Sequence, residues 1–215
     1  MKTAVVVGMQ SEANIVSTMP NTVVVIGAGN ADKLAADLAA AIDGGCDHVL
    51  SFGTVGALNP SLKAGEIVVG KAEVKGIIFD PVWAGYLAAN TGGKFVTVTV
   101  VDSTVSTAAA KAALFAKTRA DVVDFETCIA AQVASSKGVP FAMLRAVSDA
   151  ADQDIPPAAL AAMNAAGGID VWAVIDSLAG DDSQLPALMK LADSSQLAFN
   201  ILAQALADVG INYGA

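Results

Sequence analysis

The chain alternates short apolar runs with longer stretches in which small apolar and polar residues are mixed. The apolar runs are rich in β-branched residues and have the length of buried strands. They predict strands at Thr3–Gly8, Thr22–Ile26, Val49–Phe52, Glu66–Val69, Phe95–Val100, Asp121–Asp124 and Phe141–Ser148. The Ala-rich stretches predict helices at Ala31–Ile42, Ala108–Lys117 and Thr127–Lys137. This alternation is typical of a mostly parallel sheet covered by helices.

The pattern changes after Pro156 and Pro157, because no later apolar run has the character of a strand. Ile169–Leu178 instead carries apolar residues at helical spacing, and Leu185–Val209 predicts one or two further helices. We expect one α/β domain spanning residues 1–215, in which residues 156–215 form a helical tail.

The composition bears on the cellular location of the protein. Apolar residues make up 54% of the chain and charged residues 15%, but no apolar stretch approaches the roughly 18 residues that span a bilayer. The run Thr3–Gly8 is also too short for the apolar region of a signal peptide. These features predict a cytoplasmic protein without a transmembrane segment, with peripheral attachment to a membrane as an alternative.

The ionisable residues limit the kinds of partner, metal site and catalytic group that the protein can have. The formal net charge is −9, and the 12 lysines and arginines are scattered, so nucleic acid is not an expected partner. Cys46 and Cys128 have neither metal-binding nor redox spacing. The single histidine, His48, excludes a centre built from several histidines. We therefore expect no metal and no cofactor, and chemistry that uses carboxylates.

One possible function of the glycine-rich turn after the second predicted strand is binding of a dinucleotide cofactor. Gly27-Ala28-Gly29 follows a predicted strand and precedes a helix, as the glycine turn of a dinucleotide-binding fold does. However, Asp32 stands where the third glycine belongs, and Asp47 precedes its strand instead of ending it. We therefore interpret the segment as a close strand–helix turn that needs small residues.

Three other segments place polar residues at the ends of predicted strands: Gly8–Glu12, Ser51–Ala57, and Val123–Glu126 together with Arg145–Asp149. In open α/β sheets the ligand crevice lies at the carboxyl ends of the strands, so these residues are expected to meet there. Taken singly, each acid is better explained as a helix cap or a solvated loop residue. Their combination is what indicates a site.

The combination resembles the 5′-methylthioadenosine/S-adenosylhomocysteine nucleosidases and the wider superfamily of purine and uridine phosphorylases, from Val5 to about Asp154. Arg145–Gln153 is similar to the nucleosidase signature, and Phe52–Val69 to the family's glycine loop and next strand. The resemblance implies a three-layer fold, with a mixed, mostly parallel central sheet flanked by helices and extra C-terminal helices. It also implies a homodimer.

Within that superfamily the chain most resembles the hopanoid-associated phosphorylases, which are implied to release adenine from adenosylhopane in bacterial hopanoid synthesis. This likeness rests on Val101–Ser103, Pro156–Leu160 and the tail containing Gln184–Leu188. It implies cleavage of the N-glycosidic bond of an adenine nucleoside. The alternatives are an ordinary 5′-methylthioadenosine/S-adenosylhomocysteine nucleosidase, a phosphate-dependent purine nucleoside phosphorylase, and a nucleoside-binding protein without activity.

The resemblance implies roles for the polar residues on the base and sugar. Breaking a ribose–purine bond puts positive charge on the sugar and negative charge on the leaving base. Asp149 is implied to be the general acid at purine N7, oriented by Ser148. Glu126 is implied to accept hydrogen bonds from the ribose hydroxyls and to stabilise the developing cation.

The nucleophile is the main ambiguity. Glu12 matches the nucleosidase acid that orients the attacking water, and Arg145 and Thr54 match the other groups around it. Phosphorylases of the superfamily bind phosphate with two arginines, one in the first loop and one just before the glycine loop. At these positions this chain has Asn14 and Ser51 instead. The residues therefore favour hydrolysis, although the most similar family is called a phosphorylase.

The chain departs from the nucleosidases at two places. Thr104 stands where they present an aromatic side chain to the base, so Phe125 is the alternative for stacking, with Val105 and Gly53 also expected to contact the substrate. The link between the first two strands is short, which leaves the 5′ side of the nucleoside open. We expect a large apolar 5′ group there, accommodated with help from the C-terminal helices.

Overall fold

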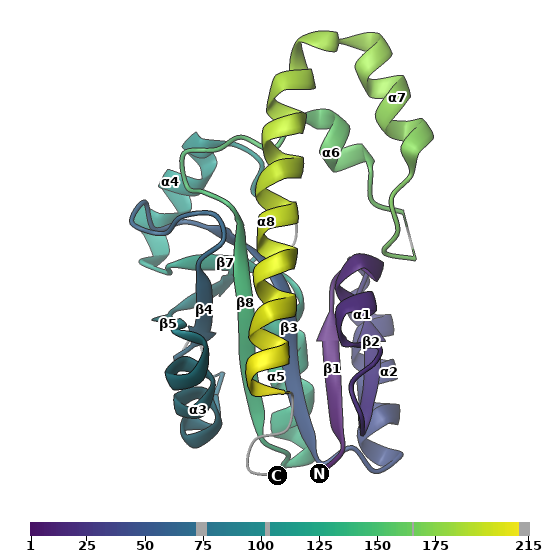
Figure 1. The fold of residues 1–215 in the computed structure, drawn as a ribbon, viewed down its shortest axis with the longest axis vertical. Coiled ribbons are helices and arrows are strands. Elements are labelled where there is room, and N and C mark those ends of the chain that lie inside the picture. Colours follow the sequence, from purple (N-terminus) through teal and green to yellow (C-terminus); the bar gives the residue numbers. More distant parts are fainter. Residues whose placement is uncertain (72–76, 102–103, 165, 211–215) are drawn as a thin grey trace.

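The computed structural model describes residues 1–71, 77–101, 104–164 and 166–210. Within these ranges eight strands form one sheet, whose main path is β2–β1–β3–β8–β4–β5, and β7 joins beside β3 and carries β6 (Figure 1). The strands are β1 (Thr3–Val7), β2 (Thr22–Ile26), β3 (His48–Ala57), β4 (Ile67–Gly70), β5 (Lys94–Val96), β6 (Val98–Val100), β7 (Val122–Asp124) and β8 (Phe141–Asp149).

The centre of the sheet is parallel. β1 pairs in parallel with β2 and β3, and β3 pairs in parallel with β8. Every residue of β1 and β8 is buried, as expected for strands that are covered on both faces. β4 runs antiparallel to β8, and β7 antiparallel to β3. The prediction of a mixed, mostly parallel sheet is therefore confirmed.

Helices cover both faces of the sheet and give the molecule three layers (Figure 1). Apolar side chains of α2 and α5 pack on one face, and those of α1, α3 and α8 pack on the other. The helices are α1 (Gln10–Val16), α2 (Ala31–Asp43), α3 (Pro81–Thr91), α4 (Ala108–Thr118), α5 (Glu126–Lys137), α6 (Pro157–Ala161), α7 (Val171–Gly180) and α8 (Leu185–Val209), with a 3₁₀ turn at Asp182–Gln184.

β3 is longer than the sequence predicts. The apolar pattern gives a strand at Val49–Phe52 with a glycine loop after it, but β3 continues through Gly53 and Gly56. The added residues pair with β7 on one side and with the end of β8 on the other, so that Gly56 lies opposite both Val123 and Asp149. Glycine and threonine give no apolar signal, which is why the pattern misses this extension.

The predicted strand Phe95–Val100 is in fact two strands, and the prediction of one is wrong. Thr97 separates β5 from β6. Its backbone N–H and its hydroxyl both donate to Asp121 Oδ2, at 2.8 and 2.9 Å. The break allows β5 to pair with β4 while β6 pairs with β7.

Two helices lie outside the predicted set. α1 occupies the link that the sequence leaves without structure, and its seven residues are too few for a periodic apolar signal. α3 did have sequence signals. Asp80 caps it by accepting from the backbone N–H groups of Val82 and Trp83, Pro81 fills its first turn, and Gly92 ends it in the left-handed conformation.

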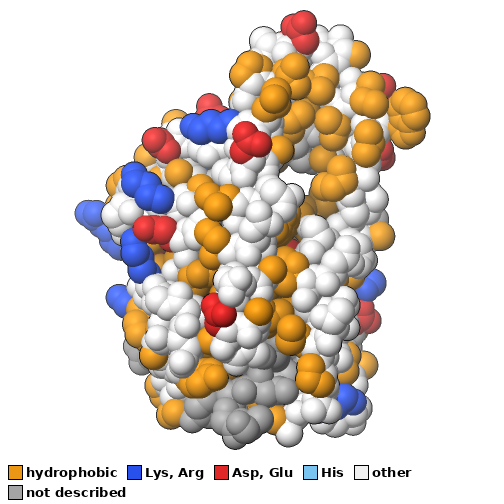
Figure 2. Space-filling model, viewed as in Figure 1, with side chains coloured by type: hydrophobic (Ala, Val, Ile, Leu, Met, Phe, Trp, Pro, Cys, Tyr) orange, Lys and Arg blue, Asp and Glu red, His pale blue; other side chains and the backbone are white. Residues whose placement is uncertain are grey.

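The regular elements described after Pro156 are helical, as predicted, apart from an isolated antiparallel bridge between Met163 and Ile169, and α8 has the predicted bounds Leu185–Val209. α8 packs along the sheet, whereas α7, all of whose residues are described, has no buried side chain. Trp172 is 75% exposed, and apolar side chains gather at the end of the molecule that α6 and α7 form (Figure 2). None of the described helices combines the length and apolar character needed to cross a membrane.

Candidate active site

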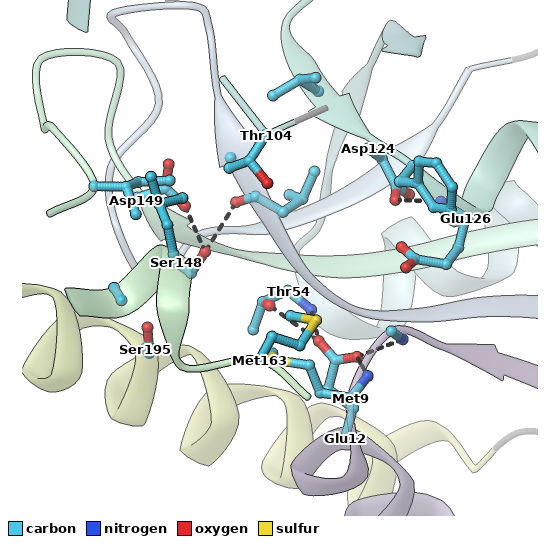
Figure 3. A pocket seen from close by; sticks show the side chains of 18 of the residues that line it. Met9, Glu12, Thr54, Thr104, Asp124, Glu126, Ser148, Asp149, Met163 and Ser195 are labelled. Carbon is cyan, nitrogen blue, oxygen red and sulfur yellow. Dashed lines mark hydrogen bonds between the residues drawn. The ribbon is translucent and has the colours of Figure 1, made fainter. Parts of the chain in front are cut away.

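A pocket of about 550 Å³ opens at the carboxyl ends of β1, β3 and β8, next to α6 and α8. Val105 lines an adjoining recess of about 270 Å³, and Gly53 lies against the carboxyl group of Glu12. The other eight predicted site residues all line the pocket: Glu12, Thr54, Thr104, Phe125, Glu126, Arg145, Ser148 and Asp149. Figure 3 labels Glu12, Thr54, Thr104, Glu126, Ser148 and Asp149 of this set. The structure therefore brings together the segments that the sequence singles out.

Glu12, on α1, is buried, and four donors hold its carboxyl group. Oε2 accepts from the backbone N–H groups of Gly8 and Met9, at 2.8 and 3.1 Å. Oε1 accepts from the backbone N–H and the hydroxyl of Thr54, at 2.7 and 2.9 Å. Of these donors the Thr54 hydroxyl can rotate toward a ligand, which would leave Oε1 free to accept a hydrogen bond from that ligand.

Asp149 ends β8, and both of its carboxyl oxygens have partners. Oδ1 accepts from the hydroxyl of Ser148 at 2.7 Å, while Oδ2 lies 2.6 Å from Nζ of Lys111 on α4. Gly56 admits the carboxyl group, because a Cβ at that position would come within 3.1 Å of Oδ2. The acid is thus fixed by groups from two separate elements.

Arg145 occupies another side of the pocket and is surrounded by acceptors. Its Nε lies 2.9 Å from Asp124 Oδ2, and Nη2 lies 3.7 Å from Glu126 Oε2. Nη1 donates to the carbonyl of Thr54 at 2.9 Å, and Nη2 donates to the hydroxyl of Ser51 at 2.8 Å. The guanidinium therefore donates two hydrogen bonds to the protein, while its Nε lies beside Asp124 as an ion pair without a hydrogen bond.

Burial and crowded charge shift two pKa values here. Burial and the charge of Asp124 together raise the pKa of Glu126 to about 8, although Arg145 acts in the opposite direction. Glu126 is therefore mostly protonated at neutral pH, whereas the sequence analysis expected a carboxylate. Burial lowers the pKa of Arg145, but Asp124, Glu126 and Glu12 together outweigh it and raise that pKa.

Two glycines make room for the other carboxyl groups. Gly53 has φ of +136°, and a Cβ there would overlap the carboxyl carbon of Glu12. A Cβ at Gly27 would come 2.8 Å from Cγ of Glu126. The turn Gly27-Ala28-Gly29 therefore needs a small residue, as predicted, but the reason includes an approaching acid as well as close strand–helix packing.

The remaining wall of the pocket is mainly apolar. Phe125 and Ile155 line both the pocket and the adjoining recess, near Asp149. Leu160, Met163 and Leu191 come from the C-terminal region. No described residue of α7 lines the pocket, so its apolar face lies outside the site. Among the described residues, no group of three or more histidine, cysteine or acidic side chains is arranged to hold a metal ion.

Comparison with known proteins places this pocket in a family. The sequence model described as the phosphorylase superfamily matches residues 2–88 and 77–175, which is most of the chain. The chain belongs to the phosphorylase superfamily. No curated protein sequence matches it.

Solved structures share this superfamily fold at low sequence identity. The 5′-methylthioadenosine/S-adenosylhomocysteine nucleosidase of Neisseria meningitidis, in complex with methylthio-immucillin-A, is 17% identical, with 97% of each chain covered and a TM-score of 0.68. Futalosine hydrolase of Helicobacter pylori strain 26695 is 15% identical, with 97% of each chain covered and a TM-score of 0.70. The predicted family and fold are therefore confirmed, and the likeness to hopanoid-associated phosphorylases stays a prediction.

The sequence analysis missed two residues that contact the acids and the arginine of the site, Lys111 and Asp124. Lys111 lies in an alanine-rich helix, where a lysine is normally solvated, so no local signal marks it. The sequence does mark Asp124, because it and Glu126 flank Phe125 at the end of a strand. The sequence analysis nevertheless assigns a role only to Glu126. The structure shows that Asp124 is the nearer partner of Arg145.

Proposed function

We propose that this protein hydrolyses the N-glycosidic bond of an adenine nucleoside and releases adenine. The observation that carries the proposal is the placement of Glu12, Glu126 and Asp149, from three separate segments, around one pocket of ligand size. Such acids can stabilise positive charge on the sugar and supply a proton to the base. The fold shared with a nucleosidase and a hydrolase supports it.

At the base, Asp149 is the general acid in this proposal. A protonated carboxyl group donates to N7 of adenine while its second oxygen accepts from the 6-amino group. Ser148 orients this group through the 2.7 Å hydrogen bond to Oδ1. Thr104 is too small to stack on a purine, so Phe125, which lines the same recess, provides the aromatic face.

At the sugar, Glu126 binds the ribose hydroxyls. Its pKa of about 8 means that the free protein holds it mostly as the neutral acid at pH 7. A cationic sugar nearby favours the carboxylate, so as positive charge develops this proton passes to Asp124, which accepts the side-chain hydrogen bond of Glu126. The negative charge of Glu126 then appears where the reaction requires it.

Water, not phosphate, is the nucleophile in this proposal. Glu12 and the Thr54 hydroxyl are placed to orient a water molecule. A phosphate ligand needs free cationic groups, but Arg145 is committed to Asp124 and to neighbouring acceptors. The other arginine, Arg119, is exposed at the end of α4 and does not line the pocket.

The substrate proposed here carries a large apolar 5′ group, and adenosylhopane is the candidate that the sequence resemblance offers. Once the base, ribose and water are assigned to the acids, the apolar wall is left for the 5′ substituent. Leu160 and Met163 on this wall are 44% and 48% exposed. Covering such surface contributes about 25 cal/mol per Å², so covering on the order of 100 Å² or more outweighs the roughly 1 kcal/mol of one missing stacking ring.

The activity is tested by incubating the protein with adenosines of different 5′ substituents and measuring free adenine by chromatography, with and without phosphate. We expect a free ribosyl product and a rate independent of phosphate. Asp149→Asn should lower turnover by about 10² or more, whereas Asp152→Asn, the same change at an exposed position, should not. A ribose 1-phosphate product would refute hydrolysis, and an active Asp149→Asn variant would refute the role of Asp149.

The 5′ preference is a separate measurement. Values of kcat/KM for 5′-alkyl adenosines of increasing chain length, at constant detergent, should rise with length. If the 5′-methylthio substrate is cleaved at least as efficiently as the longer ones, an ordinary nucleosidase becomes the better assignment.

A further inference from the structure

Lys111 is buried completely, and its amino group contacts an acid of the pocket. Its side chain is 0% exposed, and Nζ donates to Asp149 Oδ2 at 2.6 Å, to the carbonyl of Ala150 at 2.9 Å and to the carbonyl of Gln153 at 2.8 Å. An ammonium group has three N–H donors, so all three are used. A buried ammonium is unfavourable unless it is hydrogen-bonded in this way, and its acidic partner is Asp149, the acid of the proposed reaction.

We propose that Lys111 is a positioning residue for the departure of the base, acting through Asp149. It holds the carboxyl group of Asp149 against the leaving group and stabilises the negative charge that Asp149 acquires as its proton passes to the base. This inference rests on the proposed function, because it requires Asp149 to be the general acid.

The geometry supports a positioning role. Ser148 and Lys111 bind different oxygens of the Asp149 carboxyl group, so the group cannot rotate without breaking one of these bonds. α4 is itself held beside the end of β8, since Asp154 accepts from the backbone N–H of Ala108 at 2.6 Å. The ammonium therefore has a fixed position relative to the acid.

The charge of Lys111 supports a role in the reaction itself. In the proposed step the O–H bond of Asp149 breaks and an N7–H bond forms, while the electron pair of the C1′–N9 bond moves to the base. Asp149 becomes a carboxylate in this step, 2.6 Å from an ammonium that keeps its own protons. Away from water such a contact stabilises the new charge more strongly than solvent does.

The test compares two leaving groups, because Lys111 acts only where the leaving group needs a proton. Lys111→Met and Lys117→Met, an exposed control on the same helix, are assayed on the adenine nucleoside and on a 4-nitrophenyl riboside with the same 5′ substituent. Nitrophenolate departs without protonation. We expect Lys111→Met to lower kcat on the adenine nucleoside by about 10²-fold and on the nitrophenyl riboside by less than about threefold, with Lys117→Met unchanged on both.

A double-mutant cycle gives the second readout. Once Asp149→Asn has removed the acid, adding Lys111→Met should lower adenine release no further. Equal losses on both leaving groups, additive losses in the cycle, or a fully active Lys111→Met variant would each overturn the inference. If Asp149→Asn itself does not discriminate between the leaving groups, the proposed function fails instead.

A measurement on the unaltered protein covers the case in which Lys111→Met does not fold. With lysine labelled by ¹⁵N, the Nζ resonance of Lys111, identified by its absence from Lys111→Arg, should shift when adenine binds. An unshifted resonance in adenine-saturated protein would overturn the inference.

Discussion

Arg145 on β8 and Asp124 at the end of β7 form an ion pair of 2.9 Å in which each side chain is 2% exposed. β7 and β8 both pair with the extended part of β3, so this ion pair joins the strands on its two sides. Glu12 and Glu126 also act on the charge of Arg145. The acids around this guanidinium therefore keep it charged, and Asp124 is its nearest partner.

Removing that guanidinium should strongly destabilise the fold. Arg145→Met leaves buried acids without their counter-charge, and breaking a buried pair in this way costs about 3–5 kcal/mol. Urea unfolding measures the loss, with Arg119→Met at an exposed position as the control. A loss below about 1 kcal/mol would show that the acids are neutralised in another way.

Glu126 should make stability depend on pH. Its pKa is about 8 in the folded protein against an ordinary value of 4.5, so the stability gained from its proton is complete below pH 4.5 and is lost as pH rises through about 8. Glu126→Gln cannot lose that proton. The Tm of Glu126→Gln minus that of the unaltered protein should therefore increase from pH 5 to 8 and then stay constant.

The control for this pH series is Glu66→Gln. Burial opposes the charge of Glu66, but hydrogen bonds from Lys94 and Lys63 outweigh it and lower its pKa. The stability contribution of Glu66 is therefore lost only as pH falls below its ordinary range. The difference in Tm between Glu66→Gln and the unaltered protein should stay constant from pH 5 to 9. A constant difference for Glu126→Gln as well would contradict the raised pKa of Glu126.

Gly53→Ala should impair both stability and turnover. The new Cβ would overlap the Glu12 carboxyl group, and φ of +136° is unfavourable for alanine. We expect a loss of about 1–3 kcal/mol and a fall in kcat of about tenfold or more, because the water would be misplaced. Gly85→Ala, in α3 with nothing within 4 Å of the new Cβ, should be neutral or slightly stabilising.

Phe125→Leu should weaken adenine binding if Phe125 supplies the stacking face. Loss of an aromatic contact of roughly 1 kcal/mol corresponds to about fivefold in Kd. Calorimetry with adenine measures this change, and Phe95→Leu, on β5 outside the pocket, is the matched control. An unchanged Kd would mean that another side chain contacts the face of the base.

The sequence predicts the acids of the site better than it predicts the elements that hold them. Glu12, Glu126 and Asp149 follow apolar strands, and the carboxyl ends of parallel strands meet at one edge of the sheet. A pattern that is local in the sequence therefore predicts which acids lie together. The course of β3 past Phe52 has no such signal. Its added residues become a strand because β7 and β8 flank them, which depends on contacts distant in sequence.

Lys111 shows the same limit for a single side chain. Within its helix it is one lysine among alanines, and only the position of α4 beside the end of β8 makes it buried. The pKa of Glu126 is likewise a property of the assembled cluster, because Asp124 and Arg145 set it together with burial. Patterns along the chain identify candidate groups, whereas their charge states depend on tertiary neighbours.

The extension of β3 has a consequence for how the two acids are held relative to each other. Gly53 lies against Glu12 and Gly56 against Asp149, so the contact points of the two acids on β3 are three residues apart, about 10 Å of extended strand. β8 pairs with this part of β3 on one side, and β7 pairs with Gly56 on the other. In the proposed reaction Glu12 serves the anomeric carbon and Asp149 serves N7 of the base, so a single strand sets the separation between the attacking water and the proton donor.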